Sequence, residues 1–104
     1  TERFEARCKS KLMTSIVEYA SNEHGRIREW RRDGMLDIAA TSLELLDLNS
    51  VEDFNSQIDK TLIPEFCDAV RTADGQLKPH IVAYIQQSLD RLADLQKIEA
   101  GHGG

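Results

Sequence analysis

The stretch from Met35 to Leu48, MLDIAATSLELLDL, decides how the rest of the chain has to be arranged. Nine of its fourteen residues are apolar, and on a helical wheel all of them except Leu48 cover an arc of roughly 220°, whereas a surface helix needs a stripe little wider than ~100°. They are Met35, Leu36, Ile38, Ala39, Ala40, Leu43, Leu45, Leu46 and Leu48. We therefore expect a helix from about Gly34 to Leu48 that is either enclosed by its own core or partly covered by another chain.

Before this stretch the apolar residues recur at four-residue steps, a spacing that places them on one face of a helix. The residues that do so are Phe4, Cys8, Leu12, Ile16 and Ala20. We expect a first helix over about Glu2 to Asn22, with a break or kink near Gly25. The whole chain has only four valines and six aromatic residues, so it is poor in residues that favour strands. We therefore predict an all-α protein.

After this stretch, Ser50-Val51-Glu52-Asp53 has a hydroxyl for an N-cap and acids for a first helical turn. The apolar phase then continues across Pro64, so we expect one third helix with a kink at Pro64. Asp74-Gly75 predicts a turn. A fourth helix is expected from Pro79 to about Ala100, because proline favours the first helical position and Gly101 can end the helix.

The length of the chain fits a single domain. The 104 residues are a common domain length, and no apolar run approaches the ~18 residues of a membrane span. We expect a small bundle of about four helices over residues 1–100 and a flexible, glycine-rich tail at 101–104. The net charge of −5 is uneven, since residues 1–33 carry +2 and residues 34–104 carry −7.

Cysteines and histidines do not form a recognisable site. Cys8 and Cys67 lie 59 positions apart on or beside apolar helical stripes, where a thiol behaves as a small hydrophobe. We expect two reduced thiols, which favours a cytoplasmic location. The three histidines lack the spacing of metal ligands, and the sequence has no nucleophile elbow, phosphate-binding glycine loop or metalloprotease motif. We therefore expect no metal, no cofactor and no enzymatic activity.

Four arginines crowd around Trp30, at Arg26, Arg28, Arg31 and Arg32. One interpretation is a contact patch, because Arg and Trp are enriched at binding hot spots and Arg also binds phosphates. The other is a solvated helical turn whose Trp fills the core. Nucleic-acid binding through the arginines is a weaker alternative, because Glu29 and Asp33 interrupt them and the acidic remainder repels phosphate.

The surplus of apolar surface favours an interaction protein, most simply one that also forms a two-fold dimer. The candidate interface, toward a partner or a second copy, consists of Ile27, Trp30, Arg31, Arg32, Met35, Leu36, Ile38 and Leu43. A helical secretion or assembly chaperone is a further alternative, because such a protein also hides apolar surface on its partner.

Two segments, Ile27-Arg28-Glu29-Trp30-Arg31-Arg32 and the leucine-rich run from Met35 to Leu48, resemble the small quorum-sensing antiactivators of Pseudomonas. Similar length, an acidic helical body and the lack of a catalytic motif add to the resemblance. It implies a cytoplasmic dimer that binds the ligand-binding domain of a LuxR-type regulator such as LasR. By occupying the regulator's dimerisation surface, such a protein would keep the regulator from its promoter.

Overall fold

The computed structural model describes residues 2–60 and 63–102, and the side chains of residues 6–60 and 63–98. Within these residues the chain forms six α-helices, a short 3-10 helix and no strand, so the all-α prediction is confirmed. None of the described helices is both long enough and apolar enough to cross a lipid bilayer.

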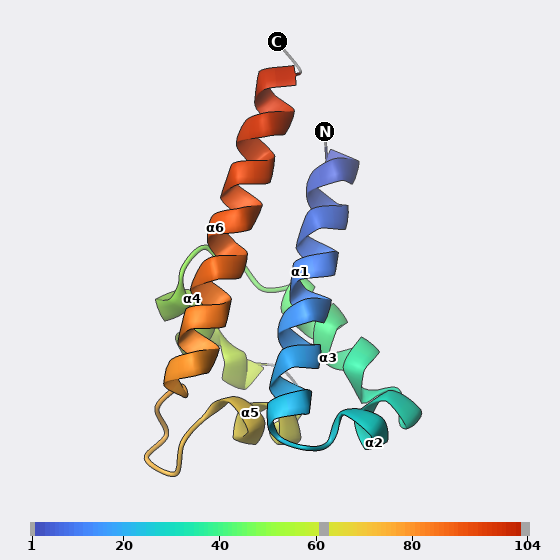
Figure 1. Cartoon of the computed structure of the whole chain (residues 1–104), viewed down its shortest axis with the longest axis vertical. Coiled ribbons are helices and arrows are strands. Elements are labelled where there is room, and N and C mark those ends of the chain that lie inside the picture. Colours follow the sequence, from blue (N-terminus) through green and yellow to red (C-terminus); the bar gives the residue numbers. More distant parts are fainter. Residues whose placement is uncertain (1, 61–62, 103–104) are drawn as a thin grey trace.

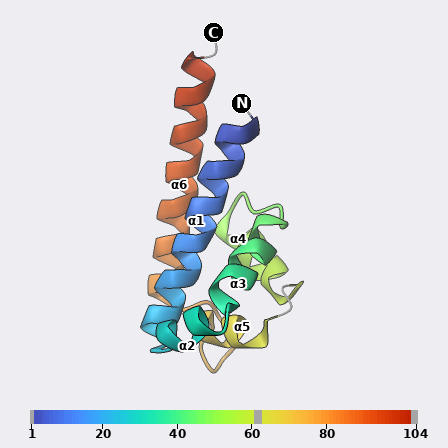
Figure 2. The same ribbon diagram turned by 90° about the vertical axis from the view of Figure 1, so that its right-hand side faces the viewer.

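The helices form two layers (Figures 1 and 2). The first layer is an antiparallel pair of long helices, α1 (Glu2–Glu23) and α6 (Pro79–His102). The second layer contains α2 (Ile27–Arg32), α3 (Met35–Glu44), α4 (Val51–Gln57), the 3-10 helix η1 (Ile58–Lys60) and α5 (Pro64–Val70). The amino-terminal half of α1 and the carboxy-terminal half of α6 extend together beyond the second layer.

The core lies between the two layers. From α1 it takes Met13, Ile16, Val17 and Ala20, and from α6 Ile81 and Ile85, all at most 2% exposed. The second layer adds Phe54 and Phe66, whose rings meet edge to face with centroids 6.3 Å apart. α3 packs along α1 and against α2, so its apolar arc is enclosed on more than one side.

Two glycines divide the first half of the chain. Gly25 has a φ of +76° and Gly34 a φ of +78°, a backbone region that glycine adopts without steric cost. The predicted break near Gly25 is confirmed, because α1 ends at Glu23 and α2 begins at Ile27. The predicted second helix is too long at its far end, because α3 ends at Glu44 and the chain turns before Leu48.

The prediction of one helix kinked at Pro64 is wrong. α4 passes into η1, Ile63 is extended at φ −124° and ψ 90°, and a separate helix, α5, begins with Pro64. The reason is that proline disfavours helical geometry at the residue before it, while its missing N–H costs nothing at a first helical position. This division, together with the short α2, yields six α-helices among the described residues instead of about four.

Other local predictions are confirmed with one exception. The Ser50 hydroxyl caps α4 by accepting a hydrogen bond from the Asp53 N–H at 3.1 Å, and Gly75 turns the chain with a φ of +82°. The exception is the end of the last helix, since α6 continues through Gly101 to His102. A glycine near a helix end costs only about 1 kcal/mol relative to alanine, so it need not stop the helix. The last two glycines of the predicted tail lie outside the described residues.

Candidate interaction surface

Trp30 lies in the core and is 4% exposed. Its indole packs beside the imidazole of His24, with the ring centroids 6.2 Å apart. This burial agrees with the interpretation in which the arginines lie on a solvated helical turn and the tryptophan fills the core of the protein. The surrounding arginines point outward, because Arg26, Arg28, Arg31 and Arg32 are all exposed. A partner can therefore reach the arginines of α2 but not the indole.

The predicted interface residues separate into buried and accessible groups. Besides Trp30, Leu36 is 7% exposed and Leu43 is fully buried, so these two leucines stabilise the core and cannot contact a partner on this fold. The physical reason is that α1 and α2 cover their side of α3. Ile27 and Met35 are half-buried. Ile38, Arg31 and Arg32 are exposed.

The exposed side of α3 carries a mostly apolar stripe that includes two residues missing from the sequence-based interface, Ser42 and Leu45. Among the described residues, the large hydrophobic side chains that are exposed are Ile38 (55%), Leu45 (83%) and Ile98 (55%). Met35, Ile38, Ser42 and Leu45 follow one another at steps of three and four residues, which places them along one side of a helix. Leu45 continues this line because its backbone, at φ −80° and ψ −10°, is still helical. We call these four residues the α3 stripe.

The polar member of the α3 stripe does not expose an unsatisfied hydroxyl. Ser42 Oγ donates a hydrogen bond to the Ile38 carbonyl at 2.8 Å, one turn earlier in the same helix. The hydroxyl is thereby satisfied without a partner, and a docking helix does not have to supply an acceptor for it. Ile38 and Leu45 are therefore available for apolar packing, whereas Met35 is half-buried and packs partly against the core.

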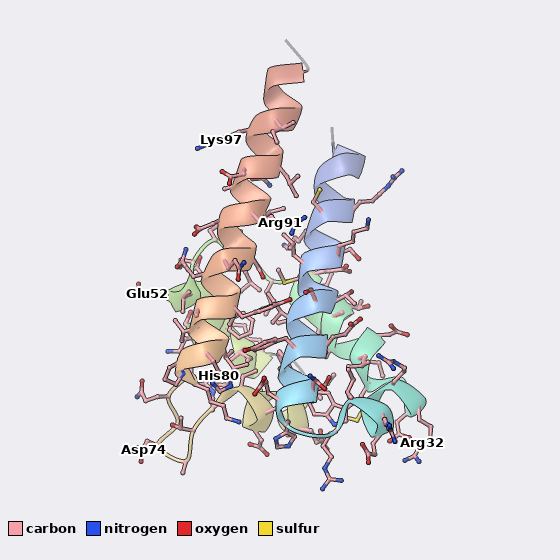
Figure 3. All side chains as sticks on the ribbon, in the orientation of Figure 1. Arg32, Glu52, Asp74, His80, Arg91 and Lys97 are labelled. Carbon is pink, nitrogen blue, oxygen red and sulfur yellow. The ribbon has the colours of Figure 1, made fainter. Side chains whose placement is uncertain are left out.

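Both ends of the α3 stripe have acidic and basic side chains nearby. At the Met35 end lie the exposed arginines of α2, and Arg32, labelled in Figure 3, also pairs with Asp33 at 3.3 Å. At the Leu45 end Glu44 lies beside Arg7 and Lys9 of α1, and Asp47 follows in the chain.

The Leu45 end of the stripe is tied to the long helix α1. Lys9 Nζ donates a hydrogen bond to the Leu46 carbonyl at 2.8 Å. Beside this contact lies a shallow cavity of about 360 Å³, lined by Ala6, Arg7, Lys9, Ser10 and Glu44. The contact fixes the point at which the chain leaves α3, so Leu45 is held in place although its side chain is exposed.

The remaining polar side chains between the long helices serve packing. Tyr19 and Tyr84 stack with centroids 4.2 Å apart, Ser15 and Tyr84 share a hydrogen bond, and His80 lies 3.7 Å from Glu23 (Figure 3). These contacts fasten α1 to α6. In the part of the chain that the structure describes, no three His, Cys, Asp or Glu side chains gather as metal ligands would. Both cysteines are half-buried, and the Cys67 thiol donates a hydrogen bond to the Ile58 carbonyl at 3.5 Å.

The fold and surface thus define a small all-α protein whose most distinctive exposed feature is an apolar helix stripe beside a group of arginines. Comparisons of the chain with models of protein families, with curated proteins and with solved structures found no match.

Proposed function

We propose that this chain is a non-enzymatic regulatory protein that binds and sequesters another protein through the α3 stripe. The observation that carries the proposal is the exposure of Ile38 and Leu45 along one side of a single helix. Scattered exposed hydrophobic residues are ordinary, but aligned ones at helical spacing form a surface on which another helix can pack.

The chemistry of the partner follows from this surface. Residues at alternating steps of three and four accept the side chains of a facing helix, as in coiled-coil packing. Arg31 and Arg32 are exposed and precede Met35 in the chain, so we expect them to pair with carboxylates at the edge of that contact. The partner is therefore a protein with an apolar helical surface that has carboxylates on one side.

The resemblance to quorum-sensing antiactivators supplies a particular partner, the ligand-binding domain of a LuxR-type regulator. A two-fold dimer interface of such a regulator is apolar, so a second protein with apolar surface can compete for it by mass action. We propose that the chain, itself a homodimer in the cytoplasm when free, captures the regulator in this way and keeps it from DNA.

The test is direct binding of the purified ligand-binding domain, measured by isothermal titration calorimetry. Ile38→Asp should lower the affinity about tenfold or more, because a carboxylate would be buried against apolar surface. Ile98→Asp is the matched control, since Ile98 is equally exposed, at 55%, but lies on α6. Equal affinities for the two variants would remove the α3 stripe from the proposal, and no binding by the unmodified chain would remove this partner.

Nucleic-acid binding stays a second candidate, because all four arginines of the cluster are exposed. The net charge of −5 opposes it. A gel shift at two salt concentrations separates the candidates, since phosphate binding falls steeply with salt and apolar packing does not. We expect no shifted band at either concentration.

A further inference from the structure

A small cavity lies between the long helices α1 and α6, beside the hydrogen bond of Ser15 with Tyr84. Its volume is about 110 Å³, which is room for about three or four water molecules at ~30 Å³ each. Both helices contribute to its walls, α1 with Leu12 and Ser15, and α6 with Tyr84, Gln87, Ser88 and Arg91. Steps of three and four residues along each helix place these side chains on the two facing sides.

Ser88 has a hydroxyl group that opens into this cavity. The residue is only 6% exposed, and its hydroxyl has no hydrogen-bond partner in the part of the chain that the structure describes. Every fully buried polar side-chain atom of the described residues does have a partner, so the Ser88 hydroxyl is not sealed inside the protein. It therefore reaches the cavity that Ser88 lines, where a ligand can complete its hydrogen bonding.

Arg91 adds a positive charge to the same cavity. Its side chain makes no ion pair or hydrogen bond with the described residues, and Figure 3 shows it on the side of α6 that faces α1. The nearby carboxylates of Asp90 and Asp94 border a separate hollow on α6 that Arg91 also borders. On α1, Lys11 and Glu18 have opposite signs and do not line the cavity either. Among the described residues that line it, Arg91 is the charged one.

The polar groups of the cavity offer hydrogens to an acceptor. Ser15 and Tyr84 use one of their two hydroxyl hydrogens on each other, and the Ser88 hydroxyl and the Arg91 guanidinium add further donors. The guanidinium repels a metal cation, whereas the two oxygens of a carboxylate accept from it and from a hydroxyl at the same time. One positive charge balances a singly charged anion, and Leu12 provides an apolar wall for a short alkyl group.

We propose that this cavity binds a small monocarboxylate of about two or three carbon atoms, whose oxygens accept hydrogen bonds from Ser88 and Arg91. The volume admits a molecule of this size. Because the ligand contacts both α1 and α6, its binding stabilises the pairing of the two helices by mass action. The site is separate from the α3 stripe, and the inference does not depend on the proposed function.

Titration of the full chain with sodium acetate, followed by heteronuclear NMR, tests the site. The backbone amides of Ser88 and Arg91 and of their neighbours should shift and saturate. We expect a Kd on the order of millimolar, because a ligand with so few atoms makes few contacts. Sodium chloride at the same concentrations should produce no saturable shift of these amides. Acetamide, which has the size of acetate without its charge, should produce none either.

Substitutions of the two donors locate the ligand in the cavity. Ser88→Ala and Arg91→Gln should each weaken acetate binding about tenfold, because each removes a hydrogen bond to a charged oxygen. Lys97→Gln is the matched control for the charge, since Lys97 lies on the side of α6 away from α1 (Figure 3). Ser56→Ala is the control for the hydroxyl, since Ser56 is exposed on α4. Both controls should bind acetate as the unmodified chain does, and circular dichroism checks that every variant keeps its helices.

Three results would overturn the proposal. The first is a titration in which acetate causes no saturable shift of the amides around the cavity. The second is equal binding of acetamide, which would mean that the charge of Arg91 has no part in recognition. The third is unchanged affinity in both Ser88→Ala and Arg91→Gln, which would place any bound acetate elsewhere on the chain.

Discussion

Leu43 and Leu45 lie two positions apart in the same leucine-rich run and have opposite environments. Leu43 is fully buried, whereas Leu45 is 83% exposed. Leu43→Ala should lower the free energy of unfolding by about 2–5 kcal/mol, because it leaves a cavity in the core. Leu45→Ala should change it by no more than about 0.5 kcal/mol. Chemical denaturation followed by circular dichroism measures both, and similar costs for the two would contradict the orientation of α3.

Ser50 offers a second residue-scale prediction. Its hydroxyl accepts the Asp53 N–H bond that caps α4, so Ser50→Ala should lower the free energy of unfolding by about 1 kcal/mol. Ser56→Ala is the matched control, because the Ser56 hydroxyl donates to the Asp53 carbonyl within the same helix and lies on its exposed side. The control should cost less than half as much in the same denaturation experiment. A reversed order would mean that Ser50 is not the cap.

At the scale of residues, the sequence was sufficient to predict a capping serine but not an interface. A cap depends on neighbours in sequence, so Ser50 and Asp53 could be paired before any tertiary structure was known. Whether Leu36 or Leu45 is covered depends on α1 and α2, which the helical wheel does not contain. The three- and four-residue spacing of the α3 stripe was visible in the sequence. Its exposure was not.

At the scale of elements, a substitution of Pro64 distinguishes two descriptions of the segment after Ser50: separate helices, or one helix with a kink. Because proline is the first residue of α5, Pro64→Ala removes no strain, and it should leave the free energy of unfolding within about 1 kcal/mol of the unmodified chain. In a single kinked helix the same change would stabilise the protein by about 3 kcal/mol and raise the helix content. Thermal and chemical denaturation with far-ultraviolet circular dichroism distinguish the two results.

The long elements were predictable and the short ones were not. α1 has an apolar repeat over several turns and a glycine at its end, and its predicted bounds agree with the structure within one residue. α2 and α5 have six and seven residues, so one apolar period cannot separate them from neighbouring helices. Their existence depends on Gly25, Gly34 and Pro64 acting as boundaries, and on the packing of Trp30 and Phe66 into the core.

At the scale of the whole molecule, the two layers leave one side of α3 uncovered while enclosing the other. The sequence argument from a 220° apolar arc offered an enclosed helix or one covered by another chain. The structure encloses Leu36, Ala39, Ala40 and Leu43 and exposes Ile38 and Leu45. The enclosed alternative therefore holds for one side of the helix, and the covering of its other side by another chain stays a prediction. The partner itself could not be predicted from these residues, because an apolar stripe specifies packing geometry and not identity.

The central claim, capture of a regulator through the α3 stripe, is tested most directly by light scattering coupled to size-exclusion chromatography. The sample is the dimeric ligand-binding domain of a LuxR-type regulator, run alone and with an excess of the chain. We predict that the regulator dimer is replaced by a complex containing both proteins, and that Leu45→Asp leaves the dimer intact while Ile98→Asp still disrupts it. A regulator dimer that persists at every excess of the unmodified chain, or that Leu45→Asp disrupts equally well, would contradict the claim.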